Sequence, residues 1–223
     1  MTPVEVDTLF RIYIDEPDTT FVSDAVVESY LAAGYREFRN FVCDIDPMIY
    51  NVSQNITITD LLSYDMAAPP TVQPAFLGAS VDATNGRLIR LNNFYELDSS
   101  GNTKIIFESA SNVDALDSAS SAYFLANTVL RFSRRLTGTF AVHYVPEAAV
   151  WTAIVTAGFI DDLTPFHDLI ALLATKQYAI QDGAASDTVV AQLTERLGRF
   201  EEYLRERAFP GVGYVQAVPW LGL

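Results

Sequence analysis

Two pairs of carboxylates are the residues of this chain best suited to chemistry: Asp44 with Asp46, and Asp161 with Asp162. Closely spaced carboxylates ligate divalent cations or share the roles of general acid and general base. A hydrolase with a divalent ion between Asp44, Asp46 and Asp161 is therefore one reading. Both pairs fall at predicted helix boundaries, however, where acidic residues are common. We therefore expect neither a metal site nor a catalytic residue at these positions.

The other reactive residue types form no catalytic pattern. Cys43 lies inside a helical pattern, His143 lies on a predicted strand, and His167 falls in the first turns of a later helix. No Cys/His cluster has metal-binding spacing, and no G-x-S-x-G motif marks a nucleophile. Gly211-Val-Gly213 follows a helix, whereas phosphate-binding glycine loops precede one. The sequence thus predicts a protein that is not an enzyme and has no cofactor.

Composition restricts the partners of the chain. Among 223 residues, 28 are acidic and 14 are Lys or Arg, for a formal net charge of −14. Proteins that grip nucleic acid by neutralising phosphates are normally basic, so we expect this surface to repel DNA. Half of the residues are hydrophobic, which predicts a folded core. No run of about 18 apolar residues predicts a membrane span, and the acidic N-terminus argues against a signal peptide.

The N-terminal part of the chain, residues 1–48, predicts a pair of helices. Thr2, Pro3 and Glu5 have the types and spacing of a capping box with a proline in the first turn. A second helix is predicted over about 23–45, because its apolar positions repeat in alternating steps of four and three.

The middle of the chain, residues 49–158, predicts an antiparallel β lobe. β-Branched and aromatic residues concentrate there in five short segments. These segments are residues 56–59, 87–97, 103–109, 123–133 and 139–145. Residues 98–102 predict a hairpin turn, and residues 136–138 predict the connection between the last two strands. Residues 65–83 and 109–122 predict exposed loops.

Helical periodicity returns in residues 159–208, with a break near 183–187. Neither helix pair covers its apolar stripe alone, so packing residues 159–208 against 1–48 buries both stripes. The expected fold class is α+β. An antiparallel four-helix body is formed by the N- and C-terminal helix pairs, with an inserted antiparallel β lobe and an extended C-terminal tail.

The last fifteen residues, 209–223, carry no charged side chain, although they follow a helix rich in Arg and Glu. Their two prolines and three glycines disfavour a helix, so an extended segment is predicted. Either this segment folds back on its own chain or it binds another one, and we expect the second. The predicted partner contacts are its large apolar side chains: Phe209, Tyr214, Val215, Trp220 and Leu221.

The helical segments resemble the head-to-tail adaptor (connector) proteins of tailed bacteriophages. Residues 21–38 (FVSDAVVESYLAAGYREF) look like the second helix of those proteins, and residues 163–174 (LTPFHDLIALLA) look like their third. The break near 183–187 and the helix that contains Arg199, Phe200 and Glu201 complete the pattern. Residues 49–158 depart from it, because the β segment is larger than in compact adaptors.

The resemblance implies a non-enzymatic structural protein of the virion neck, made in the host cytoplasm. Such a protein forms a homo-oligomeric ring, typically of twelve subunits, docked beneath the portal protein. Residues 209–223 would insert among portal subunits, and residues 49–158 would face neighbouring copies or the next neck or tail component. DNA would pass through the channel during ejection without specific binding. Another neck or tail component, such as a stopper or a tail-end ring protein, is the alternative, with the carboxylate hydrolase as a further one.

Overall fold

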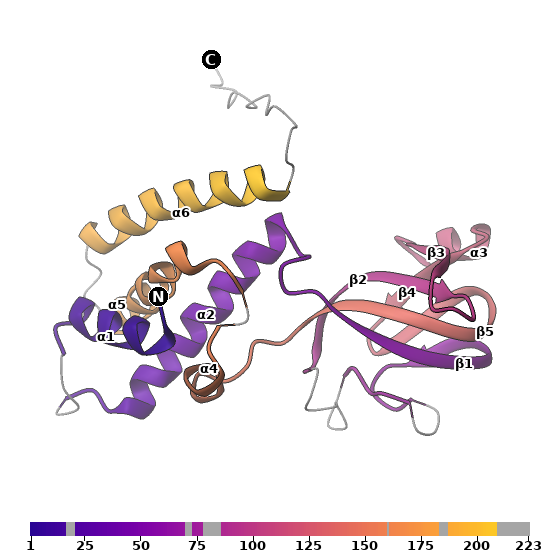
Figure 1. Cartoon of the computed structure of the whole chain (residues 1–223), viewed down its shortest axis with the longest axis horizontal. Coiled ribbons are helices and arrows are strands. Elements are labelled where there is room, and N and C mark those ends of the chain that lie inside the picture. Colours follow the sequence, from indigo (N-terminus) through magenta and orange to yellow (C-terminus); the bar gives the residue numbers. More distant parts are fainter. Residues whose placement is uncertain (17–20, 70–72, 78–85, 160, 183–186, 209–223) are drawn as a thin grey trace, which may run out of the picture. The chain divides into compact units, whose positions relative to one another are not determined.

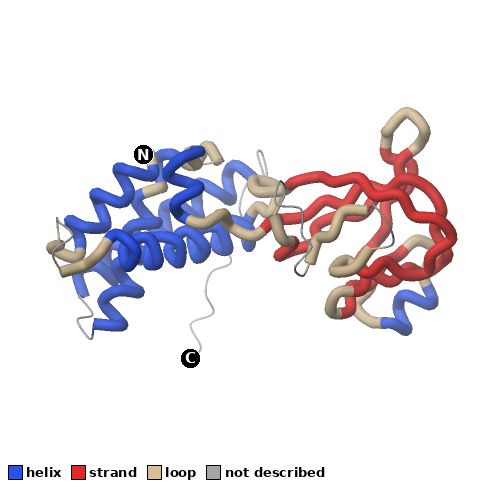
Figure 2. Tube along the Cα trace, turned by 90° about the horizontal axis from the view of Figure 1, so that it is seen from below, coloured by secondary structure: helices blue, strands red, loops and turns tan. Residues whose placement is uncertain are grey.

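The computed structural model of this chain describes residues 1–16, 21–69, 73–77, 86–159, 161–182 and 187–208 (Figure 1). The chain divides into two compact units. The helical unit comprises Met1–Asp46 together with the chain from Asp162 onward, and the barrel unit comprises Pro47–Asp161. All five described strands belong to one unit and the long helices to the other, as the colouring of Figure 2 shows.

The helical unit is built around one central helix. Its elements are α1 (Pro3–Tyr13), α2 (Asp24–Ile45), the short 3₁₀ helix η1 (Thr164–Phe166), α5 (Asp168–Asp182) and α6 (Asp187–Ala208). Every residue from 169 to 175 in α5 is buried, and α5 packs against α1, α2 and α6. A helix that is apolar on all sides must be surrounded by other helices, which explains its central place.

The N-terminus of α1 confirms the predicted capping box. The Glu5 N–H donates to the Thr2 hydroxyl over 3.2 Å, and the Thr2 N–H donates to a Glu5 carboxylate oxygen over 2.7 Å. Ser23 occupies the N-cap position of α2, but its side chain makes no capping hydrogen bond. The predicted span of about 23–45 is close to the observed α2.

Gly34 sets the distance between α2 and α5. A Cβ atom at this position would lie 2.6 Å from the Ile170 carbonyl oxygen and 2.9 Å from the Ala174 amide nitrogen. Both are backbone atoms, so no side-chain rotation relieves the clash. The small residue in the sequence LAAG therefore permits the close crossing of these two helices.

The barrel unit contains a five-stranded sheet of strand order β1-β5-β2-β3-β4. The strands are β1 (Val52–Asp65), β2 (Leu88–Leu97), β3 (Thr103–Ser109), β4 (Ala122–Ala126) and β5 (Val129–Pro146). β4 pairs with β5 as well as with β3, so four strands close into a barrel and β1 is added outside it. β5 has 18 residues and pairs with three other strands, which makes it the framework of this unit.

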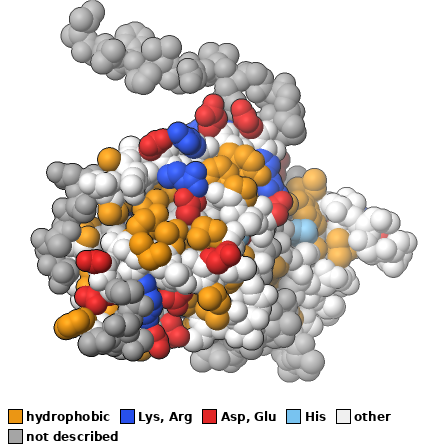
Figure 3. All heavy atoms as spheres, turned by 60° about the vertical axis from the view of Figure 1, so that its left-hand side comes forward, with side chains coloured by type: hydrophobic (Ala, Val, Ile, Leu, Met, Phe, Trp, Pro, Cys, Tyr) orange, Lys and Arg blue, Asp and Glu red, His pale blue; other side chains and the backbone are white. Residues whose placement is uncertain are grey.

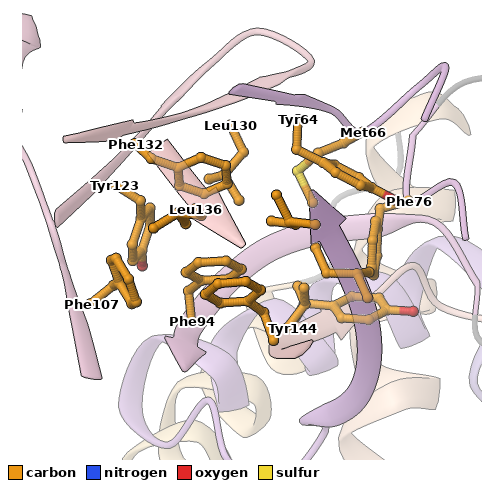
Figure 4. Close-up of a cluster of buried hydrophobic side chains, with 14 of the residues drawn as sticks. Tyr64, Met66, Phe76, Phe94, Phe107, Tyr123, Leu130, Phe132, Leu136 and Tyr144 are labelled. Atoms are coloured by element: carbon orange, nitrogen blue, oxygen red, sulfur yellow. The ribbon is translucent and has the colours of Figure 1, made fainter. Parts of the chain in front are cut away.

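Aromatic side chains fill the barrel unit (Figure 4). Phe94 is fully buried and stacks on Phe140 and Phe132, with ring centroids 5.1 and 5.3 Å apart. Phe107 and Tyr123 meet the same ring edge to face. These contacts join residues from β2, β3, β4 and β5, so the core is buried only when these four strands close into the barrel.

The expected fold class, a four-helix body with an inserted antiparallel β lobe, is wrong as a description of the chain. The described residues form six α-helices, two of which, α3 (Val113–Ser118) and α4 (Trp151–Ala157), lie within the predicted β lobe. The strands form a five-stranded sheet with a closed four-strand barrel, and the β3–β4 pair is parallel. Barrel closure depends on pairing between distant segments, which local periodicity does not reveal.

The predicted connection at residues 136–138 is also wrong. Residues 136–138 do not join two strands, because β5 runs through them and Leu136 and Thr139 both pair with β1. The real turn between β4 and β5 lies at Asn127 and Thr128, where Asn127 has a φ of 54°. Asn tolerates the left-handed conformation better than most residues, so it provides the turn without a glycine.

Candidate functional site

The carboxylates singled out in the sequence have protein partners. Asp161 accepts a hydrogen bond of 2.6 Å from the Tyr50 hydroxyl, and Asp162 accepts one of 2.7 Å from the Arg207 guanidinium. Asp46 is the C-cap residue of α2. Within the described ranges, no group of three or more His, Cys, Asp or Glu side chains has an arrangement suited to a metal ion.

Cys43 and His167 are both buried in the helical unit, with exposed fractions of 7% and 2%. His167 Nδ1 lies 3.1 Å from the Met1 carbonyl oxygen, and its ring meets Phe38 edge to face. These contacts give His167 a role in tying the N-terminus to the helices.

His143 is the centre of a polar network on the outer face of the barrel unit. β5 places it between β1 and β2, directly opposite Ser53 on one side and Asn93 on the other. Its Nε2 lies 3.2 Å from the Ser53 hydroxyl, and its Nδ1 lies 3.1 Å from the Asn51 amide nitrogen. This Ser–His–Asn arrangement is similar to a hydrolytic triad. The direction of the hydrogen bonds decides whether His143 can activate Ser53.

The hydrogen bonds of this network point in the wrong direction for His143 to act as a base toward Ser53. The Asn92 amide nitrogen donates to the Pro47 carbonyl, which can only accept, and also to the Asn51 side-chain oxygen over 2.9 Å. Because the Asn51 side-chain oxygen faces Asn92, the Asn51 side-chain nitrogen faces His143 and donates to its Nδ1. In the neutral ring Nε2 then carries the proton and donates to Ser53, so His143 has no lone pair to take the Ser53 proton.

Burial lowers the pKa of His143 below its usual value, because desolvation penalises the imidazolium. Protonation would also place a second N–H against the Asn51 amide, which is itself a donor. Both effects favour the neutral ring. Sequence reasoning did not foresee this network, because Asn51 and Ser53 lie about 90 positions from His143 and meet it only through strand pairing.

An aromatic cluster fixes α6 to the rest of the helical unit, and we call it the α6 anchor: Phe38, Phe41, Phe166, Phe200 and Tyr203. The Phe200 ring is fully buried and stacks on Phe38 with centroids 5.1 Å apart and an interplanar angle of 8°. Phe41 and Phe166 meet the same ring at 5.7 and 4.7 Å. Phe166 also contacts Tyr203 at 5.0 Å, one turn nearer the end of α6.

Arginines of α6 add to the α6 anchor. Arg196 donates to both oxygens of the Asp168 carboxylate, at 2.8 and 2.6 Å, and lies over the Phe166 ring. Hydrogen bonding to Asp168 raises the pKa of Arg196. Arg207 binds Asp162 in the last turn of the helix. A bidentate arginine–carboxylate pair restricts orientation as well as distance, so Arg196 fixes the direction of α6, and the single Arg207 contact extends the attachment to its last turn.

The five predicted partner contacts, Phe209, Tyr214, Val215, Trp220 and Leu221, lie outside the described residues, so the structure does not place them. On the helical unit itself, Figure 3 shows hydrophobic side chains interspersed with acidic and basic ones. Among the described residues of this unit, the exposed large apolar side chains are Val4, Ile12, Phe21, Val26, Ile180 and Val190. Val190, on α6, is 51% exposed.

Comparison with known proteins identifies no family for this chain. No protein-family model matches it, and no curated protein matches it. Among the described helices, none has the length and hydropathy needed to cross a bilayer. The function therefore has to be inferred from the chain's own residues.

Proposed function

We propose that this chain is a structural virion protein that links the portal to the tail of a tailed bacteriophage. In this role, copies of the chain form a ring at the head-to-tail junction and line part of the path of the DNA. Residues 209–223 bind the portal protein, with Phe209, Tyr214, Val215, Trp220 and Leu221 as the contacts. No cofactor, metal ion or catalytic residue takes part.

The observation that carries this proposal is the junction at the end of α6. A charge-free segment of fifteen residues follows a helix that the α6 anchor and the Arg207–Asp162 pair hold in place. An extended apolar segment on a fixed base suits strand addition or insertion into a partner, because backbone hydrogen bonds and aromatic anchors then act together. Fully extended, it reaches on the order of 50 Å.

Two further observations support the proposal. A net charge of −14 disfavours adhesion to DNA, which suits a passage through which DNA must slide. The His143 network has a hydrogen-bond direction that leaves Ser53 unactivated, and Asp161 is engaged by Tyr50. No observation on the described residues favours the carboxylate hydrolase. The same anchored helix and apolar tail would also serve a stopper or a tail-end ring, so the choice of partner has to be tested.

The test compares the full chain with a chain truncated after Ala208, each mixed with portal rings from the same phage. We expect the truncated chain to keep its melting temperature, because the α6 anchor lies wholly within residues 1–208. We also expect it to lose co-sedimentation with the portal. Trp220→Ala should weaken binding, while Gln216→Ala serves as the matched control within the same segment. A truncated chain that melts lower and binds the portal undiminished would contradict the proposal.

A further inference from the structure

The outer face of the sheet carries three registered rows of uncharged residues. The first row is Ser53, His143 and Asn93; the second is Asn55, Ala141, Tyr95 and Ile106; the third is Thr57, Thr139, Leu97 and Thr103. Directly paired residues of neighbouring strands project to the same face, so these rows form one continuous surface over β1, β5 and β2, which the second and third rows extend onto β3. We call it the neutral face. The edge-to-face contact of Tyr95 with His143, at 5.0 Å, confirms that the first two rows adjoin.

The neutral face contrasts with the rest of this acidic chain. Charged residues make up 19% of the sequence and acids outnumber bases two to one, yet the three rows contain neither. The side chains are instead hydroxyls, amides, a phenol and a neutral imidazole, together with three apolar ones, Ala141, Leu97 and Ile106, of which Ile106 is 62% exposed. Surfaces of this composition recur where proteins bind proteins through adaptable polar contacts.

The edge of β1 beside the neutral face carries few of the usual protective features in its own sequence. Among the described strands, β1 pairs only with β5, and residues 52–59 contain no charge and no proline. Natural sheets usually protect such an edge with lysine, proline or a bulge, and the first bulge of β1 comes only after Ile58. The Thr57 N–H is satisfied by the Gln73 side chain. A strand edge with no charge, proline or bulge over residues 52–58, next to a neutral surface, favours a protein partner.

The charge of the chain favours a second copy of the same chain as this protein partner. Two copies of this chain, each with a net charge of −14, repel one another over most orientations, and they approach at least cost where charged side chains are missing. We propose that the neutral face is a contact surface for a second copy of this chain. This inference deepens the proposed function, on which it rests for the assembly, by naming the surface through which neighbouring copies meet.

The size of the neutral face sets the strength of the contact. Four strands about 4.8 Å apart and five residues of about 3.4 Å each give a surface of roughly 300 Å². A stable protein interface buries about 800 Å² on each partner, so one such contact is weak. Copies held side by side on a common partner would accumulate many such contacts, and these would become effective together.

Sedimentation velocity over rising protein concentration tests the inference. We expect the wild-type chain to self-associate, and more strongly at higher salt, because salt screens the mutual repulsion. Thr139→Glu places a charge in the neutral face and should weaken association by about tenfold or more. Thr139→Gln is the neutral control for side-chain size, and Ser99→Glu adds the same charge in the exposed β2–β3 turn. Both controls should associate as the wild type does.

Three results would overturn the inference: a wild-type chain that is monomeric at every concentration and salt, a Thr139→Glu variant that associates as tightly as the wild type, or a Ser99→Glu variant that is weakened equally. Circular dichroism of each variant checks that it is folded. A monomeric chain that binds portal rings overturns this inference alone. Self-association without portal binding overturns the proposed function alone.

Discussion

Replacing Gly34 with alanine tests the packing of the helical unit. The added Cβ would lie 2.6 Å from the Ile170 carbonyl oxygen and 2.9 Å from the Ala174 nitrogen, closer than real Cβ atoms come to such atoms. Because both atoms belong to the α5 backbone, α2 and α5 must move apart. That movement loosens the packing of an α5 segment in which every residue from 169 to 175 is buried.

Two effects of opposite sign determine how much Gly34→Ala changes the free energy of unfolding. Alanine is favoured over glycine in a helix interior by about 1 kcal/mol. Overpacking a tight core contact costs about 1–3 kcal/mol, and a clash with backbone belongs at the upper end of that range. The expected net effect of Gly34→Ala is a loss of about 1–2 kcal/mol. For a unit of about one hundred residues this lowers Tm by roughly 5–10 °C.

Gly198→Ala is the matched control, because a Cβ at Gly198 on α6 would meet nothing within 4 Å. Only the higher helix propensity of alanine acts at this position, so this variant should gain about 0.5–1 kcal/mol in free energy of unfolding. Thermal unfolding followed by circular dichroism measures both variants side by side. Equal shifts in the same direction, or a stabilised Gly34→Ala protein, would refute the close crossing of α2 and α5.

Two further predictions concern the barrel unit. Phe94→Ala removes the ring that Phe140 stacks on at 5.1 Å and should cost about 3–5 kcal/mol; a loss below about 1 kcal/mol in denaturant unfolding would exclude this core. For His143, NMR titration should give a pKa below about 6.5. Because the unfolded chain then binds more protons than the folded one between the two pKa values, stability should fall as pH decreases below about 6.5. His143→Gln should abolish that dependence, and an unchanged pH profile in this variant would contradict it.

Local features of the fold were predictable from the sequence. The capping box at Thr2 and Glu5 and the turn at residues 98–102 depend on neighbours within a few positions. The span of α2 followed from its periodic apolar stripe, since a long amphipathic helix shows its buried side in its spacing.

The features that sequence reasoning missed depend on distant partners. β4 closes the barrel only because Glu108 and Ser109 meet it from one side and β5 from the other. α4 has only seven residues, with Trp151 and Ile154 buried, too short for a periodic signal. The neutral face likewise exists only in the register of four strands, so no single segment of the sequence displays it.

Photo-crosslinking can show whether residues 209–223 bind a different protein. Benzoylphenylalanine placed at Trp220 in the full chain, mixed with portal rings and irradiated, marks whatever the segment touches. We expect a covalent adduct between position 220 and the portal protein, identified by mass spectrometry. Crosslinks found solely within the same chain would contradict it.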